Sequence, residues 1–406
     1  MTATSAARRY DIDALRVLAF GLLILYHVGM YYVADWDWHI KSRYTVEWLQ
    51  EPMRFLNQWR MSLLFVISGL ALSFVWDRYT PGRLAWRRSW RLVLPLVFGM
   101  AVIVAPQPYA EMVAADIISP GYLDFYHKYL TFSDFPGDAY GGEEQITWTW
   151  NHLWYLPYLL LYTLLLTLVG AVLPRLLANL GHLFQRLRGV VLIAVPVGVF
   201  TIYGIWIFPH YPYIDHGLVG DVYAHALYGT LFLCGFLMGR DSAFWQSLGG
   251  WRHALLTIAM IAYVALRTQD WWVGESPTHW LETLAVLNVY VNRWTWILTI
   301  LAFGHAHLNR PLPGLAYATA AIFPWYILHQ SITVIAGYNL SPLALGPVIE
   351  PMLVLGLTVL GCALGYELLI RRWRWLHPLF GVNLPPLPAR CDVDREIAGE
   401  RFVQRD

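Results

Sequence analysis

Long apolar windows recur along the whole chain and constrain its fold more than any other feature. A transmembrane helix needs about 20 mostly apolar residues. Windows close to that length cover roughly residues 12–33, 61–76, 90–108, 153–173, 190–208, 222–239, 254–267, 281–303, 314–336 and 350–370. Charged residues make up only 14% of the 406 residues, whereas soluble domains contain about 25%. The sequence therefore predicts an all-α integral membrane protein, a bundle of about ten transmembrane helices.

The distribution of arginine and lysine predicts the orientation of that bundle. Cytoplasmic segments of membrane proteins carry an excess of these residues. When successive connecting segments are assigned to alternate sides of the membrane, roughly 20 of the 28 Lys and Arg residues of this chain lie on one side. We therefore expect an even number of spans and both termini in the cytoplasm. Residues 1–380 form the predicted membrane domain, and residues 381–406 form a Pro-rich and then charged cytoplasmic tail.

Charge and cysteine content argue against other classes of protein. The formal net charge is +1 and no polybasic tail is present, so we expect no nucleic-acid partner. The cysteines Cys234, Cys362 and Cys391 are scattered, without a C-x-x-C pair. This spacing indicates neither a disulfide framework nor a zinc site, and we expect no metal.

The first window carries an arginine and a histidine on one helix face. Arg16 and His27 are eleven residues apart, which is just over three turns and about 16 Å along an α-helix. Ionisable groups are costly in hydrocarbon, so this alignment indicates a site that faces the protein interior. An equally good interpretation at this point is an arginine that reaches the headgroups and a histidine with an ordinary buried partner.

The depth of the two residues suggests how an interior site would work. If Arg16 lies near the cytoplasmic face, His27 lies near the bilayer midplane, within reach of molecules from both sides. Histidine is well suited to take a proton from a hydroxyl near neutral pH. Arginine suits a phosphate-bearing molecule, and the arginine row 83–91 would lie nearby, although the topology rule alone explains that row.

Further polar residues lie in or beside other windows. Ser68-Gly69 in the second window is a small pair that lets helices approach closely. Arg91 precedes Pro95 by one turn, and Glu282, Asn288, Asn292 and Arg293 make the eighth window polar. The others are Arg60, Arg88, His152, Trp154, His329 and Glu367. Polar residues in so many spans indicate a polar interior cavity, as in an enzyme or a transporter.

The segments expected outside the cytoplasm, 34–60 and 109–152, mix aromatic and acidic residues. Examples are Asp35-Trp-Asp-Trp-His39 and Gly141-Gly-Glu-Glu144. Aromatic faces and carboxylates together are typical of sugar recognition. The alternative is an interfacial aromatic belt, which is common in membrane proteins.

Several motifs together resemble the membrane acyltransferase-3 family. They are Arg16-x10-His27, Phe65-Val-Ile-Ser68-Gly69, Arg91-x3-Pro95 and Leu328-His329, and the resemblance covers about residues 8–380. Further motifs resemble the branch that attaches succinyl groups to osmoregulated periplasmic glucans. These are Asp13-Ala-Leu-Arg16, Arg60-Met-Ser-Leu-Leu-Phe-Val-Ile-Ser-Gly69, Asn151-His-Leu-Trp154, Phe303-Gly-His305 and Tyr366-Glu367. Tyr155-Leu-Pro-Tyr158 replaces the serine-rich continuation of the O-antigen-acetylating branch.

The resemblance implies a transmembrane O-acyltransferase. Its donor would be cytoplasmic acyl-CoA, as succinyl-CoA or acetyl-CoA, and its acceptor a periplasmic glucan or another extracytoplasmic saccharide. Arg16 and His27 would be essential, with His27 as general base. Candidate substrate-binding residues are Asp13, Arg60, Ser68, Arg88, Arg91, His152, Trp154, Glu282, Arg293 and His329.

Two points about the site stay open at this stage. Arg60, His152 or His329 would donate to the developing oxyanion, and the sequence does not rank them. A succinyl carboxylate would need a cation such as Arg293 or Arg60, yet either arginine would equally suit Glu282.

The alternative functions are a transporter or flippase of a polar substrate, or the same acyl transfer onto a lipid, peptide or other carbohydrate. The chain shows no two-half symmetry and no matched pair of Gly/Pro-broken spans, which argues against transport.

Overall fold

A computed structural model describes residues 8–133, 135, 148–212, 216–274 and 278–382. Nine helical segments among these residues are long and apolar enough to cross a membrane. They are Tyr10–Tyr32, Glu47–Trp76, Pro81–Ala114, Asn151–Val172, Val222–Gly239, Ser242–Arg267, His279–Leu308, Leu315–Leu343 and Gly346–Ile370. The shorter apolar helix Val190–Trp206 occupies the remaining predicted window. The predicted all-α polytopic membrane fold is confirmed, whereas the even number of spans and the position of the termini stay predictions.

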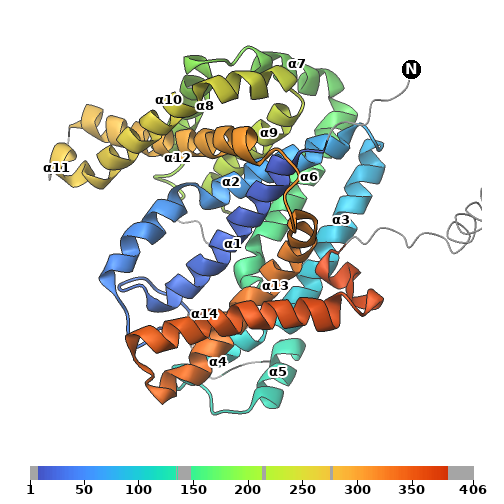
Figure 1. Ribbon diagram of the computed structural model, residues 1–406, viewed down its shortest axis with the longest axis vertical. Helices are drawn as coiled ribbons and strands as arrows, with labels where there is room; N and C mark the ends of the chain where they lie inside the picture. Colours follow the sequence, from blue (N-terminus) through green and yellow to red (C-terminus); the bar gives the residue numbers. More distant parts are fainter. Residues whose placement is uncertain (1–7, 134, 136–147, 213–215, 275–277, 383–406) are drawn as a thin grey trace, which may run out of the picture.

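Fourteen α-helices make up most of the described chain (Figure 1). They are α1 Tyr10–Tyr32, α2 Gln50–Trp76, α3 Pro81–Phe98, α4 Pro106–Ala114, α5 Tyr122–Thr131, α6 Tyr155–Val172, α7 Pro174–Gln185, α8 Val190–Trp206, α9 Val222–Gly239, α10 Ser242–Arg267, α11 Gln269–Val273, α12 His279–Leu308, α13 Leu315–Leu340 and α14 Gly346–Leu364. Two π-helical stretches, Gly99–Val104 and Gly365–Ile370, continue α3 and α14.

Two helices extend well beyond their predicted apolar windows. The window 61–76 belongs to α2, which begins at Gln50, and the window 254–267 belongs to α10, which begins at Ser242. The added turns carry charged residues such as Glu51 and Arg252, which lower the hydropathy without breaking the helix. A helix satisfies its own backbone hydrogen bonds, so it continues past the apolar part of its sequence.

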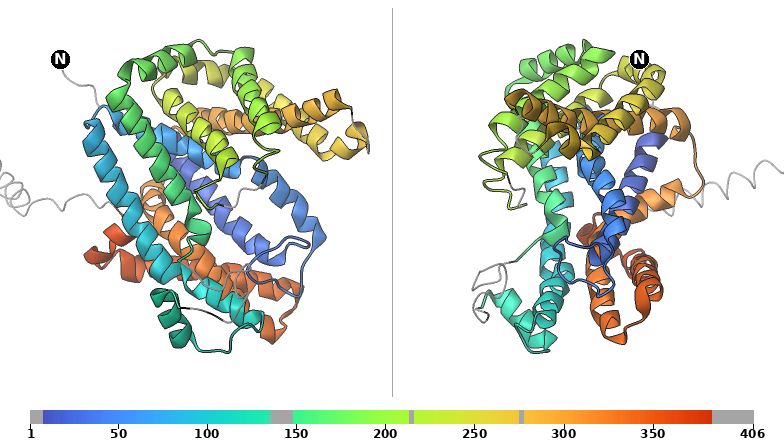
Figure 2. Two further views of the ribbon diagram at one scale, coloured as in Figure 1. Left: turned by 180° about the vertical axis from the view of Figure 1, so that it is seen from behind. Right: turned by 90° about the vertical axis from the view of Figure 1, so that its left-hand side faces the viewer.

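Helix α1 lies in the middle of the bundle, where it contacts α2, α12, α13 and α14. Figure 2 shows α7 and α5 at opposite ends of the molecule, with α1 between them. At its far end, the Lys41 amino group donates to the carbonyl oxygens of Met30 (2.6 Å) and Val33 (2.5 Å). Burial lowers the pKa of the Lys41 amino group, and Asp37 and Asp35 oppose that shift. The helix that carries Arg16 and His27 is thus held on several sides and at its end.

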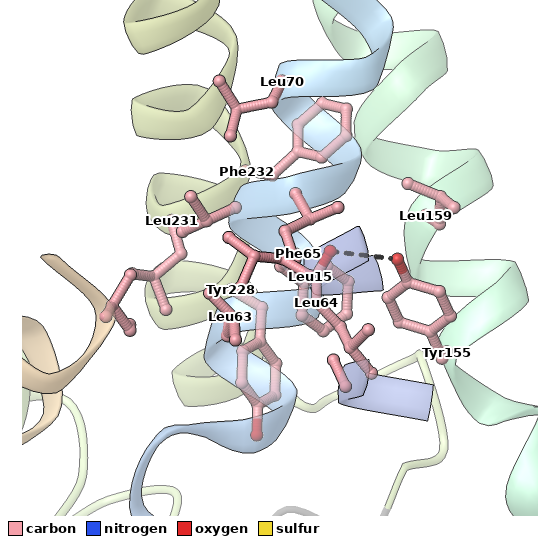
Figure 3. Packing of buried hydrophobic residues seen from close by; sticks show 14 of the residues in the cluster. Leu15, Leu63, Leu64, Phe65, Leu70, Tyr155, Leu159, Tyr228, Leu231 and Phe232 are labelled. Atoms are coloured by element: carbon pink, nitrogen blue, oxygen red, sulfur yellow. Dashed lines mark hydrogen bonds between the residues drawn. The ribbon is translucent and has the colours of Figure 1, made fainter. Parts of the chain in front are cut away.

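Helices α2 and α9 cross at two glycines. A Cβ on Gly69 would lie 2.0 Å from the Phe232 carbonyl oxygen, and one on Gly235 would lie 2.0 Å from the Val66 carbonyl oxygen. The expected close approach at Ser68-Gly69 is therefore confirmed. Figure 3 shows the apolar packing at this crossing and the hydrogen bond from the Tyr155 hydroxyl to the Leu64 carbonyl oxygen (3.2 Å). The contact joins α2, α6 and α9 into one wall.

The outer segments predicted from the sequence are shorter than expected. Residues 50–60 belong to α2, and residues 106–114 to α4. Helix α5 packs its Phe125 and Tyr129 with Met112 of α4, and the Tyr129 hydroxyl donates to the Met100 carbonyl oxygen (2.9 Å). The motif Gly141–Glu144 and tail residues 383–406 lie outside the described residues, so the predictions on them stay predictions.

Candidate functional site

Two cavities of about 370 Å³ each meet inside the bundle. The first, here called the arginine cavity, is lined by Arg16, Ser68, Arg88 and Arg91. The second, here called the histidine cavity, is lined by His27, Arg60, His152, Trp154 and Arg293. Phe20 and Tyr155 line both cavities.

These two shared side chains form the boundary between the cavities. The Phe20 ring packs edge-on against Tyr155, with centroids 6.3 Å apart, and tilts against Tyr326 at 5.0 Å. The Tyr155 hydroxyl is hydrogen-bonded to the Ser68 hydroxyl and donates to the Leu64 carbonyl oxygen. Phe20 and Tyr155 are buried, so the two cavities are separated by packed aromatic rings.

The arginine cavity draws its cations from two helices. Arg16 of α1 is fixed by a hydrogen bond from its Nη2 to Asp13 Oδ1 (3.0 Å), and Arg8 binds the other oxygen of Asp13 (2.9 Å). Arg88 and Arg91 of α3 line the same cavity. They are three residues apart and therefore share a helix face. Three guanidinium groups around one cavity suit a ligand with several phosphates.

In the histidine cavity, His27 and His329 form a hydrogen-bonded pair. His27 Nδ1 lies 2.7 Å from His329 Nε2, and the rings are parallel within 1°. His329 Nδ1 lies 2.7 Å from the Tyr326 carbonyl oxygen, which accepts only a proton-bearing nitrogen. His329 Nε2 must then accept, and His27 Nδ1 must donate. In the neutral pair, His27 Nε2 therefore carries a lone pair, as a general base requires.

The third histidine, His152, uses both of its ring nitrogens in other hydrogen bonds. His152 Nε2 lies 3.0 Å from the Ile327 carbonyl oxygen, and its Nδ1 lies 3.3 Å from the Gln107 amide nitrogen. The ring therefore donates through Nε2 and accepts through Nδ1. Because His329 also uses both nitrogens, neither of these two rings has a free N–H to offer a substrate.

Gln107 is the centre of a buried amide network behind the histidines. Its carbonyl oxygen accepts from Asn151 Nδ2 and Gln330 Nε2, both at 3.0 Å, and its nitrogen donates to Ser331 Oγ at 2.7 Å. Gln330 also contacts His39 Nε2 at 3.0 Å. The bonds satisfy these buried groups and tie α4 and the turn before α6 to α13.

The network reaches the rim of the bundle through a hydrogen bond between His39 and Glu111. His39 Nδ1 lies 2.6 Å from Glu111 Oε2, and the Glu111 side chain is 32% exposed. His39 is the last residue of the aromatic and acidic motif at 35–39. Part of the segment predicted to recognise sugar thus supports the site through hydrogen bonds.

Two arginines of the histidine cavity keep unpaired nitrogen atoms. Arg60 is 5% exposed, and its guanidinium carbon lies 3.5 Å from the centroid of the Tyr26 ring. Its Nε and Nη1 have no hydrogen-bond partner among the described residues. Arg293 donates through Nε to the Gln58 carbonyl oxygen (2.9 Å), while its buried Nη1 has no such partner.

The structure brings together nearly all of the predicted site residues. Those that line a cavity are Arg16, His27, Arg60, Ser68, Arg88, Arg91, His152, Trp154 and Arg293. His329 is bonded to His27, and Asp13 to Arg16. Glu282 lies apart, on the first turn of α12, where it contacts His279 at 3.3 Å.

The ion pair between Glu282 and Arg293 that the sequence suggested does not form in this structure. The two residues are eleven positions apart on α12, or about 16 Å along its axis. Arg293 instead contacts the Gln58 carbonyl oxygen.

Sequence reasoning missed Phe20, Tyr26, Gln107 and the network around Gln330. A usable signal existed for Phe20, which follows Arg16 by four residues and precedes His27 by seven, and so lies on their helix face. Gln330 directly follows His329 within an apolar window. The contact of Gln107 with these residues is not readable from local spacing, because Ser331 is 224 positions away.

Comparisons with known proteins identify relatives of this chain. A family profile described as an acyltransferase domain, of the acyltransferase-3 type, matches residues 9–367. Relatives called glucans biosynthesis protein C, from Escherichia coli O139:H28 and from strain K12, are 24% identical over 357 residues. Another from Escherichia coli O1:K1 is 25% identical over 362 residues. Each alignment covers 84% of this chain and 86% of the relative. No solved structure matches the chain.

Proposed function

We propose that this chain, which belongs to the acyltransferase-3 family, transfers an acyl group from cytoplasmic acyl-CoA to a hydroxyl of an extracytoplasmic glucan. The family makes the chain a membrane acyltransferase, which argues against the transporter alternative. One observation carries the specific proposal. An arginine-lined cavity and a cavity with an oriented histidine meet at the same two side chains, Phe20 and Tyr155.

The arginine cavity is the proposed donor site. The phosphates of coenzyme A would bind Arg16, Arg88 and Arg91, because guanidinium groups form charge-assisted hydrogen bonds with phosphate. The pantetheine arm would then place the thioester at the Phe20–Tyr155 boundary. Succinyl and acetyl are both candidate acyl groups. This arrangement requires Arg16 on the cytoplasmic side of the inner membrane, in agreement with the charge distribution of the sequence.

In the proposed reaction His27 is the general base. Its Nε2 takes the proton of the acceptor hydroxyl while that oxygen attacks the thioester carbonyl carbon. The tetrahedral intermediate collapses by breaking the C–S bond, and the thiolate leaving group receives the proton from His27. An ester and free coenzyme A result, so no other reactant is needed. His329 positions the base, because it accepts the His27 Nδ1–H.

Arg60 is the proposed donor to the oxyanion. Of the three candidates, His152 and His329 have both ring nitrogens engaged, whereas Arg60 has two unpaired nitrogens. A preorganised cation at the developing negative charge lowers the barrier most in a site that excludes water.

The aromatic lining of the histidine cavity supports a saccharide acceptor. Trp38, Trp154 and Tyr228 line it, and flat aromatic faces suit the C–H surfaces of sugar rings. The printed name of the Escherichia coli relatives refers to glucans. Lipids, peptides and other carbohydrates are the alternative acceptors, which mass analysis of the product separates.

Reconstituted vesicles test the proposal directly. Acyl-CoA is supplied on the side of Arg16 and purified glucan on the other side, and the acyl mass added to glucan is measured. We expect His27→Ala to lower the rate by about 10²–10⁴-fold, the usual contribution of a general base. His279→Ala, at a fully exposed histidine, is the matched control. Undiminished acyl transfer by correctly inserted His27→Ala protein would contradict the assignment of the base.

A further inference from the structure

The histidine cavity holds more positive charge than the proposed reaction requires. Arg60 and Arg293 both line it, and the described residues of its lining include no carboxylate. An unpaired buried charge is costly, because it loses its hydration and gains no ion partner. Buried charges in proteins are therefore normally paired. A tetrahedral intermediate carries one transient negative charge, for which Arg60 alone is sufficient.

Arg293 has the geometry of a binding group. Its Nε is anchored on the Gln58 carbonyl oxygen of α2 at 2.9 Å, which fixes the plane of the guanidinium. Its Nη1 is buried and has no hydrogen-bond partner within the part of the chain that the structure describes. The nearest acidic residue on its own helix, Glu282, is about three turns away. A fixed guanidinium with a free N–H edge is a good partner for a carboxylate.

We propose that the histidine cavity contains an anion subsite in which Arg293 binds a carboxylate carried by one of the two substrates. The inference rests on the proposed acyl transfer. The carboxylate has two possible sources: the far end of the acyl group, when the donor is the half-thioester of a dicarboxylic acid, or an acidic substituent of the acceptor.

The first source fits the arrangement of the two arginines. A dicarboxylic half-thioester has a reactive carbonyl and a carboxylate on one short chain. Arg60 would face the carbonyl oxygen and Arg293 the carboxylate, within the same cavity. An uncharged acyl group would leave Arg293 without a partner. The subsite would thus select the acyl group by its charge.

A matched pair of donors tests the first source. Succinyl-CoA and butyryl-CoA have acyl chains of equal carbon number, one ending in a carboxylate and the other in a methyl group. Transfer of each to a neutral glucan is measured with wild-type protein, Arg293→Met and Arg293→Lys. We expect Arg293→Met to lower the succinyl-to-butyryl ratio of kcat/KM by about 10–100-fold, the effect of losing one charge-assisted hydrogen bond. Arg293→Lys should recover part of the ratio because it keeps the charge.

A second arm tests the acceptor. Butyryl-CoA is combined with a neutral glucan and with the same glucan carrying carboxylate substituents. If the acceptor supplies the anion, Arg293→Met lowers the preference for the charged glucan and leaves the donor ratio as in the wild type. Either selective loss supports the subsite and identifies its source.

Uniform results overturn the inference. If Arg293→Met lowers all three donor–acceptor combinations equally, or changes none of them, Arg293 does not bind a substrate anion. Arg267→Gln is the control for loss of a positive charge, since Arg267 pairs with Glu51 at the exposed end of α10. It should leave both ratios unchanged. Absence of transfer by the wild-type protein with every donor and acceptor would instead contradict the proposed function itself.

Discussion

The two cavities have similar volumes, about 370 Å³ each, and both contain arginines, but among the described residues only one is lined by histidines. The arginine cavity presents three cations from α1 and α3, together with the hydrogen-bonded hydroxyls of Ser68 and Tyr155. The histidine cavity holds the His27 ring, which is hydrogen-bonded to His329 and backed by a buried amide network. Binding of phosphate needs charge in the right place, whereas proton transfer needs one nitrogen in a defined protonation state. The need for a defined protonation state explains why the proposed base is backed by a larger hydrogen-bond network than the proposed phosphate site.

The comparison predicts different kinetic signatures for the two cavities. Substitutions in the arginine cavity should act on the KM for acyl-CoA, and substitutions behind the histidine pair should act on kcat. This division holds if the nucleotide part of the donor stays in the arginine cavity during the reaction, because its binding is then the same in the ground state and the transition state.

The largest effect is expected in the arginine cavity. Arg88→Ala combined with Arg91→Ala should raise the KM for acyl-CoA by about 10³-fold, through loss of two charge-assisted contacts to phosphate. With acyl-pantetheine, which lacks the nucleotide phosphates, the same variant should behave like the wild type. Steady-state kinetics with the two donors measures the difference. Arg83→Ala, an exposed arginine of the same helix, is the control. An equal rise in KM with both donors would contradict the assignment of Arg88 and Arg91 to phosphate binding.

An intermediate effect is expected at His329. His329→Leu removes the acceptor of the His27 Nδ1–H and should lower kcat by about 10²-fold, as the base loses its orientation. His329→Gln keeps an acceptor oxygen and should recover roughly tenfold of that loss. The KM for acyl-CoA should change little in either variant. If the two variants lose the same activity, the hydrogen bond is not what orients His27.

The smallest effect is expected at the rim. Glu111→Gln keeps a hydrogen-bond acceptor for His39 but removes the negative charge of Glu111. It should lower kcat by about two- to fivefold, since the hydrogen bond itself is retained and only its charge assistance is lost. His39→Ala should cost more, because it leaves Gln330 without one partner. Comparing kcat for the two variants tests whether the network acts through hydrogen bonds. A greater loss in Glu111→Gln than in His39→Ala would point to the charge instead.

The sequence predicts the arginine cavity better than the histidine cavity. Arg16 and the row 83–91 are visible from helical spacing and from the bias of positive charge, both of which are local properties. The fold class follows equally from local hydropathy. The apolar windows failed only at helix ends such as 50–60, where polar turns continue a helix that hydropathy scales end early.

The histidine cavity depends on contacts between distant parts of the chain. His27 and His329 are 302 residues apart, and Gln330 and Gln107 are 223 apart. Spacing along one helix identifies His27, but it gives neither its partner nor its tautomer. Glu282 is predicted as a site residue because it lies within an apolar window. In the structure it lies on an exposed turn instead. Only the packing of α1 against α13 decides which polar residues meet.

The shared aromatic boundary has a consequence for the membrane itself. An enzyme that joins reactants from two sides of a bilayer risks becoming a leak for protons and ions, which would dissipate the energy stored across that bilayer. Here the two cavities end on the packed rings of Phe20 and Tyr155. The proposed reaction therefore needs no continuous aqueous path for a thioester to reach His27, and under this proposal the membrane stays electrically sealed while acyl transfer proceeds.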